Sequence, residues 1–222
     1  MFLKIGHRGA RSYEPENTLK SFERAIKLGV NAIEFDVRQT KDKELIIIHD
    51  SKVDKVTNGK GLVGRLTLKE IKLLKVEGEP IPTLAEALDF IDKKAGKILV
   101  ELKETGFENK VLKEIKKRGL EERVIIVSFL EIALEKIRRL DKKIETGLLY
   151  AKHPNPIKAA LKLKADYLLP FYRFAHKGQI EKAHKQGFKV IVWTINKKEE
   201  AREYIQKGVD GIASDKPDIL VA

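Results

Sequence analysis

The sequence contains no cysteine, one methionine and one tryptophan, and its apolar runs are only a few residues long. The lack of cysteine excludes disulfide bonds and thiolate metal ligands. No run approaches the roughly 20 apolar residues of a membrane-spanning helix. The first residues also lack the basic flank and apolar core of a signal peptide. We therefore expect a soluble, cytoplasmic protein without a stable membrane anchor.

Basic residues outnumber acidic ones, with 45 lysines and arginines against 33 aspartates and glutamates. The lysines are scattered along the predicted helices, and no basic stripe alternates with aromatic residues as on a nucleic-acid-binding surface. We therefore expect no nucleic-acid partner. A basic balance is also typical of proteins that bind anionic membranes or phosphate-bearing small molecules. The abundance of lysine and glutamate resembles the composition of thermophile proteins.

Short apolar runs alternate with amphipathic helical patterns along the chain. The runs predict strands at residues 2–7, 32–37, 98–103, 124–129, 145–150, 167–171, 189–195 and 211–214. The helical patterns lie at residues 18–28, 84–94, 108–118, 131–140, 156–161, 178–186 and 198–207. In a chain of 222 residues this alternation predicts one (β/α)8 TIM-barrel domain over residues 1–222. A doubly wound sheet is the alternative, but the turn Gly6-His7-Arg8-Gly9 lacks the third glycine of the dinucleotide-binding fingerprint.

A ninth strand-like run, residues 45–49, does not fit the alternation, because no crossover helix fits between it and residues 32–37. We interpret the two runs as a hairpin with residues 41–44 as its loop. Thr40 then faces Leu45 and Asp36 faces His49, which puts His49 on the same side as the carboxylate. Residues 51–82 are irregular and form an insertion between the second strand and its helix, where a cap over a barrel mouth is expected.

Charged residues stand in pairs near the ends of predicted strands. Glu34 and Asp36 lie two apart and so share one face, and Glu101 and Lys103 repeat the pattern on the next strand. In a barrel, such strand ends form the active site. Three carboxylates without cysteine predict a site for a divalent cation such as Mg²⁺, Ca²⁺ or Mn²⁺. The alternative is a set of ion pairs with Arg8, Arg38 or Lys103.

His7 and His49 are the candidate proton carriers, since histidine exchanges protons near neutral pH. Cleavage of a phosphodiester needs one group that takes a proton and a second that gives one to the leaving alcohol. Arg8 and Lys103 are suited to hold phosphate oxygens. A lone histidine is more often structural, but two of them beside acids at a barrel mouth favour catalysis. Trp193 either packs in the core or forms a wall of the pocket.

Short motifs follow one another in order along almost the whole chain. They include His7-Arg8-Gly9, Pro15-Glu16-Asn17-Thr18, Glu34-Phe35-Asp36-Val37, His49-Asp50, Ile81-Pro82-Thr83-Leu84, Glu101-Leu102-Lys103 and Val192-Trp193-Thr194-Ile195-Asn196. This ordered set resembles the motifs of the glycerophosphodiester phosphodiesterase family. The resemblance implies a metal-dependent phosphodiesterase on a TIM barrel with a small insertion. It departs at Lys55, Leu130 and Ser214, where the family often has arginine, aspartate and threonine, so the choice of alcohol head group stays open.

The resemblance assigns a role to each matching position. His7 and His49 match the general acid and base, Arg8 and Lys103 the phosphate contacts, and Trp193 a substrate-pocket aromatic. The metal ligands match Glu34, Asp36 and Glu101. Glu16 and Asn17 match a segment near the site. We expect Glu16 to lie behind the residues that touch the substrate, and Asn17 to be the N-cap of the helix at residues 18–28.

Three functions follow, in order of preference. The first is hydrolysis of glycerophosphodiesters, such as glycerophosphocholine and glycerophosphoethanolamine, to glycerol 3-phosphate and an alcohol. The second is a lysophospholipase D acting on lysophospholipids, which a greasy insertion would favour, whereas residues 51–80 are rich in lysine and glycine. The third is a non-enzymatic basic barrel that binds nucleic acid or anionic lipid.

Overall fold

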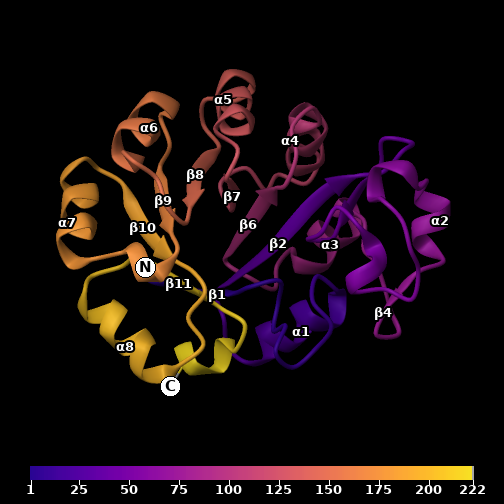
Figure 1. Cartoon of the computed structure of the whole chain (residues 1–222), viewed down its shortest axis with the longest axis horizontal. Coiled ribbons are helices and arrows are strands. Elements are labelled where there is room, and N and C mark those ends of the chain that lie inside the picture. Colours follow the sequence, from indigo (N-terminus) through magenta and orange to yellow (C-terminus); the bar gives the residue numbers. More distant parts are fainter. Residues whose placement is uncertain (222) are drawn as a thin grey trace.

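The computed structural model describes residues 1–221, and its main feature is a closed barrel of parallel strands (Figure 1). The barrel strands are β1 (Leu3–Gly6), β2 (Ala32–Gln39), β6 (Lys97–Leu102), β7 (Val124–Ser128), β8 (Glu145–Tyr150), β9 (Tyr167–Pro170), β10 (Lys189–Val192) and β11 (Gly211–Ser214). Each pairs with the next, and β1 pairs with both β2 and β11. The closure confirms the predicted (β/α)8 barrel, because a doubly wound sheet keeps two open edges.

Helices follow the strands and surround the barrel (Figure 1). They are α1 (Leu19–Lys27), α3 (Leu84–Ile91), α4 (Glu108–Lys116), α5 (Glu131–Leu140), α6 (Pro156–Leu163), α7 (Lys177–Lys185) and α8 (Lys198–Gln206). A short 3₁₀ helix, Pro217–Leu220, follows β11 where a regular barrel would have its eighth surrounding α-helix. Within residues 1–221, no helix has both the length and the apolar character needed to cross a membrane.

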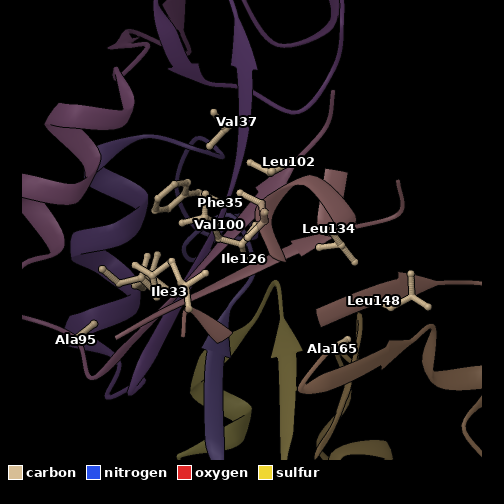
Figure 2. Close-up of a cluster of buried hydrophobic side chains, with 14 of the residues drawn as sticks. Ile33, Phe35, Val37, Ala95, Val100, Leu102, Ile126, Leu134, Leu148 and Ala165 are labelled. Atoms are coloured by element: carbon tan, nitrogen blue, oxygen red, sulfur yellow. The ribbon is translucent and has the colours of Figure 1, made fainter. Parts of the chain in front are cut away.

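The strand β2 shows how the sequence directs its carboxylates inward. Ile33, Phe35 and Val37 belong to the core between the strands and the helices. They lie one above another beside residues of β6 and β7 (Figure 2). The alternate positions Glu34 and Asp36 must therefore face the inside of the barrel. Alternate residues of β2 point to opposite faces, so the residues that pack outward against the helices also fix the acidic side chains inward.

Truncation of this outer core is expected to destabilise the protein strongly. Phe35 is fully buried, so Phe35→Ala should lower the free energy of unfolding by about 3–5 kcal/mol, through lost burial and the cavity left behind. Urea unfolding followed by circular dichroism measures this change. Leu73→Ala is the control, because Leu73 is 74% exposed and should cost less than about 0.5 kcal/mol. Equal losses for the two variants would contradict the assigned packing.

Between β2 and α3 the chain forms a lobe on one side of the barrel (Figure 1). It contains β3 (Leu45–Ile47), α2 (Leu68–Lys72), β4 (Lys75–Val76), β5 (Glu79–Pro80) and two 3₁₀ turns, Val53–Lys55 and Val63–Arg65. The lobe has a hydrophobic cluster of its own, made by Ile46, Ile48, Val53, Val63, Ile71, Val76 and Ile81. This cluster lets the lobe keep a defined shape beside the barrel.

The predicted register of the β2–β3 hairpin is wrong by one residue. Val37 faces Ile47 and Gln39 faces Leu45, so Asp36 lies opposite Ile48, not His49. The loop is shorter than predicted: the Thr40 N–H donates to the Glu44 carbonyl at 2.9 Å. Lys43 adopts a left-handed φ of 69°, which is typical of three-residue hairpin loops. A continued strand would carry His49 to the opposite face from Asp36.

The chain avoids that outcome because β3 ends at Ile47 and the backbone bends at residues 49–51. Arg38 stabilises the bend, since its Nε donates to the His49 carbonyl at 2.8 Å. The bend returns the His49 side chain to the barrel mouth, where it lines the same cavity as His7. The position of His49 therefore depends on a bend and not on strand pairing.

Candidate active site

Three buried carboxylates meet at the carboxyl ends of β2 and β6. The two strands are in register with Asp36 beside Glu101, and Glu34 lies one pleat below on the same face. Glu34, Asp36 and Glu101 each offer an oxygen within 4.8 Å of the others. All three side chains are buried. The structure thus brings together the three residues that the sequence predicted as metal ligands.

The pKa values of these acids reflect burial and crowding. Burial, with the charges of Asp36 and Glu101, raises the pKa of Glu34 well above its usual range. Burial and Asp36 likewise raise the pKa of Glu101 to about 7 against the pull of Lys103. Burial also acts on Asp36, but Arg8, Lys103 and His49 outweigh it and lower its pKa to about 2. Asp36 is therefore the permanent anion of the group.

Two cations flank Asp36. Arg8 Nε lies 3.2 Å from Asp36 Oδ2, and Lys103 Nζ lies 3.4 Å from Asp36 Oδ1 and 2.6 Å from Glu101 Oε1. The Arg8 backbone N–H also donates to Glu34 Oε2 at 2.9 Å. The alternative to a metal site, in which the carboxylates pair with basic side chains, is therefore correct in part, for Arg8 and Lys103. Arg38 pairs with Glu104 instead.

The acidic group fits a divalent cation, even with these ion pairs formed. Among residues 1–221, Glu34 Oε1 and Asp36 Oδ1 are buried oxygens without a hydrogen-bond partner. Buried carboxylate oxygens of this kind are costly unless a cation or a donor satisfies them. Three carboxylates and no thiolate form the donor set that Mg²⁺, Ca²⁺ and Mn²⁺ prefer. Glu34, Asp36 and Glu101 are thus able to hold such an ion.

His7 follows β1 and is held by a residue that follows β11. Its Nδ1 lies 2.6 Å from Asp215 Oδ1, and its Nε2 lies 3.9 Å from Glu34 Oε2. The pairing of β1 with β11 brings the two strand ends together. The backbone N–H of His7 donates to the backbone carbonyl of Ser214 at 3.0 Å. His7 therefore presents Nε2 to the acidic group and Nδ1 to Asp215.

His49 approaches the same cavity from the lobe. Its Nδ1 lies 3.1 Å from Asp50 Oδ1, and Lys55 Nζ lies 3.2 Å from the other Asp50 oxygen. Burial, together with Arg8 and Lys103, lowers the pKa of His49 against the opposing charge of Asp36. The lowered pKa favours the neutral ring, which is able to accept a proton.

A cavity of about 350 Å³ joins these groups at the barrel mouth. Its floor is apolar and comes from residues inside the barrel, such as Leu99, Val127 and Leu169. Trp193 and Phe129 meet edge to face along one side, with ring centroids 5.5 Å apart. Trp193 is thus part of the cavity wall, while its Nε1 donates to the Leu169 carbonyl at 2.8 Å.

Glu16 and Asn17 lie behind the residues that line the cavity. Arg8 Nη1 donates to Glu16 Oε1 at 2.9 Å, and Asn17 Nδ2 donates to Asp36 Oδ2 at 2.8 Å. The prediction that Asn17 is a helix N-cap is wrong. Thr18 is the N-cap of α1, since its side chain accepts from the Ser21 N–H, while Asn17 adopts a left-handed φ of 59°. Asn17 turns away from the helix because its amide bonds Asp36.

The sequence analysis missed Asp215, Arg11 and Phe129 as residues of this cavity. Asp215 directly follows β11, and Phe129 directly follows β7. The strand-end rule that selected the other residues would have found both. Arg11 lies in the loop after β1, and no pattern in the sequence marks it. Its Nε lies 3.4 Å from Asp215 Oδ1, and its Nη1 lies 3.5 Å from Glu16 Oε2.

The fold and the position of these groups define a (β/α)8-barrel enzyme, because the active sites of such barrels lie at the carboxyl ends of the strands. Residues 7–219 match the model of the Glycerophosphoryl diester phosphodiesterase family. The chain therefore belongs to this family, and it is a phosphoric diester hydrolase. The family and enzyme class predicted from the sequence motifs are confirmed.

Curated relatives and solved structures agree with this assignment. The chain is 40% identical to a glycerophosphodiester phosphodiesterase of Caldanaerobacter subterraneus, with 99% of this chain and 96% of the relative aligned. It is 32% identical to a glycerophosphodiester phosphodiesterase of Bacillus subtilis, over 98% and 85% of the two chains. An Oleispira antarctica phosphodiesterase, solved with its product sn-glycerol-3-phosphate, matches 98% of this chain and 96% of its own, with a TM-score of 0.89 and 27% identity.

Proposed function

We propose that this enzyme hydrolyses glycerophosphodiesters, such as glycerophosphocholine and glycerophosphoethanolamine, to glycerol 3-phosphate and the alcohol. The observation that carries the proposal is one cavity of about 350 Å³, lined by His7, His49, Arg8, Lys103 and the two acids Glu34 and Glu101, with Asp36 close beside them. A cavity of this size suits a small diester. The product named for the Oleispira antarctica relative, sn-glycerol-3-phosphate, is also a glycerol phosphate.

Arg8 and Lys103 are the proposed phosphate contacts. Both side chains reach the cavity from the side of Asp36, and both are largely buried. Burial strengthens their attraction for an incoming anion, because little water competes with it. Glu16 holds the Arg8 guanidinium from behind, which keeps that side chain in place before the substrate arrives.

Glu34, Asp36 and Glu101 are the proposed ligands of a divalent cation. When bound, such an ion neutralises charge that develops on the phosphate oxygens. The raised pKa values of Glu34 and Glu101 have burial as their largest cause, followed by crowding with neighbouring carboxylates. Cation binding would relieve that crowding, so we expect the ion to stabilise the folded enzyme as well as to support turnover.

His7 and His49 are the proposed general acid and base. In the first step, one histidine takes the proton of the glycerol 2-hydroxyl as its oxygen attacks phosphorus. The bond from phosphorus to the head-group oxygen breaks, and the other histidine, which enters this step protonated on both ring nitrogens, gives that oxygen a proton. Water then opens the cyclic phosphate with the two roles exchanged. Direct attack by water is the competing route, and it produces no cyclic intermediate.

The lysophospholipase D alternative receives little support from the surroundings of the cavity. A second cleft of about 760 Å³ lies between the loop after β1 and the lobe, and Arg11 lines both spaces. Its lining is largely polar and charged, with side chains such as Tyr13, Lys55, Lys75 and Glu77. An acyl chain would be poorly solvated there. The non-enzymatic reading loses its basis with the family assignment.

Chelation is expected to abolish turnover, and a hard divalent cation to restore it. Glycerophosphocholine, glycerophosphoethanolamine and lysophosphatidylcholine should each be assayed with EDTA and then with excess Mg²⁺, Mn²⁺ or Ca²⁺. We expect at least a 100-fold loss with EDTA and recovery with one of the ions, on the two diesters that lack an acyl chain. Phosphorus NMR of the mixture detects any cyclic phosphate. Full turnover in EDTA would contradict the metal assignment, and faster cleavage of the acylated substrate would contradict the substrate class.

A further inference from the structure

The hydrogen bond between His7 and Asp215 constrains how His7 can act. We propose that Asp215 is a positioning residue, which holds His7 in the tautomer with Nδ1 protonated and Nε2 free to accept a proton. The 2.6 Å contact joins His7 Nδ1 to Asp215 Oδ1, while Nε2 faces the acidic group. The inference rests on the proposed role of His7 in general acid and base catalysis.

The surroundings of Asp215 determine the direction of each hydrogen bond. The Asp215 backbone N–H can only donate, and it donates to Asn196 Oδ1 at 2.9 Å. The Asn196 amide is thereby oriented, so its Nδ2 donates to Asp215 Oδ2 at 2.8 Å. Arg11 Nε lies 3.4 Å from Asp215 Oδ1. Both oxygens of Asp215 therefore face donors, as expected for an ionised carboxylate. Such a group has no proton to give, so His7 Nδ1 is the donor in the 2.6 Å contact.

His49 is held less firmly than His7. Its partner Asp50 is the next residue in the chain and belongs to the lobe. The His49 side chain is 31% exposed against 13% for His7, and its contact with Asp50 is 3.1 Å long. Asp50 also pairs with Lys55, whose side chain is largely exposed. We therefore expect the carboxylate partner to fix the tautomer of His7 but not that of His49.

Asp215→Asn tests the inference with a side chain of the same shape. Because Asn196 Nδ2 still needs an acceptor, the new amide would turn its oxygen toward Asn196 and its NH2 group toward His7. His7 Nδ1 must then accept, and the ring proton moves to Nε2. We expect kcat to fall roughly 10³–10⁴-fold, as for loss of the aspartate in a serine protease triad, with KM changed less than about threefold. Arg11 is about a third exposed and can turn away.

A swap of the two side chains should reverse the effect. In the double variant Asn196→Asp with Asp215→Asn, the carboxylate at position 196 accepts from the amide NH2 at position 215. The amide oxygen then faces His7 again and restores the protonated Nδ1. We expect the double variant to recover at least tenfold in kcat over Asp215→Asn alone. A role of Asp215 in folding alone predicts no such recovery, and thermal unfolding of both variants measures that role separately.

Nitrogen NMR of protein labelled with ¹⁵N-histidine reads the tautomer without any assay. The protein has five histidines, and His7→Gln identifies the His7 signals by their loss. At a pH well above the histidine range, with EDTA and again with Mg²⁺, we expect wild-type Nδ1 to carry the proton and Asp215→Asn to reverse this.

Each outcome decides one of the two claims. A wild-type His7 with Nε2 protonated, or an unchanged tautomer in Asp215→Asn, overturns the positioning role. An Asp215→Asn enzyme with kcat within tenfold of wild type overturns it as well, provided that His7→Gln loses turnover. If the tautomers behave as expected but His7→Gln keeps full turnover, the proposed catalytic function fails while the positioning of His7 stands.

Discussion

His49→Ala is expected to lower kcat for glycerophosphocholine roughly 10²–10⁴-fold, because the reaction loses one of its two proton carriers. His49 lines the same cavity as His7, and burial together with Arg8 and Lys103 lowers the pKa of its ring, which favours the neutral form. Its side chain is 31% exposed, so the free energy of unfolding should change by less than about 1 kcal/mol. Steady-state kinetics with a choline-release assay measure the change in kcat.

A matched control separates catalysis from the general effect of losing a histidine. His184 is exposed and bonds Asp210, which precedes β11 at the opposite end of the barrel. His184→Ala should therefore keep turnover within about twofold of wild type. The double variant of His7 and His49 should lose little more than the worse single variant, because residues that act as a unit are not additive. Wild-type turnover in His49→Ala would remove that residue from the mechanism.

Asp36→Asn is expected to cost both cation binding and stability. Asp36 is fully buried and is the permanent anion between Arg8 and Lys103. Its lowered pKa means that the fold favours the charged form, so neutralising it should lower the free energy of unfolding at pH 7 by about 3 kcal/mol. In wild type, the charged Asp36 stabilises the fold fully at any pH above the pKa that aspartate has in the unfolded chain. This contribution is lost as the pH falls toward about 2, the pKa of Asp36 in the folded protein.

Urea unfolding in EDTA measures the loss of stability, and thermal unfolding with added Mg²⁺ measures cation binding. Mg²⁺ should raise the melting temperature of wild type but not that of Asp36→Asn. Glu203→Gln is the control, since Glu203 is exposed and pairs with Lys207 one turn along α8, a contact that contributes less than about 0.5 kcal/mol. An Asp36→Asn protein that is as stable as wild type and responds equally to Mg²⁺ would refute the assignment.

The parts of the site that could be predicted depend on local patterns. Glu34 and Asp36 share a face because a strand repeats every two residues, and Ile33, Phe35 and Val37 show which face is outside. The same rule applies to Glu101 and Lys103 on the next strand. Since all barrel strands end at one rim, these side chains had to lie near one another. His7 follows from the same rule at the end of the first strand.

The predictions that were wrong depend on backbone geometry and on contacts that the residue pattern does not show. The register of the hairpin depends on whether the loop that begins at Lys41 ends at Lys43 or at Glu44, and the left-handed backbone at Lys43 decides it. Asparagine is a common N-cap residue, but the side-chain amide of Asn17 donates a hydrogen bond to Asp36, and Thr18 caps α1 instead. His49 is placed by a bend that Arg38 stabilises. The hydrophobic and polar pattern of the sequence does not show any of these interactions.

The sequence alone determined that the chain forms a barrel and which residue types lie at its carboxyl rim, because periodicity and the order of strands and helices are local properties. Only the tertiary structure decided which of those residues touch. Closure of the barrel pairs β1 with β11, and so gives His7 its partner Asp215 from 208 positions away. The pairing of β2 with β6 puts Asp36 beside Glu101. Hydrogen bonds and ion pairs require distances of a few ångströms, and packing across the whole chain sets those distances.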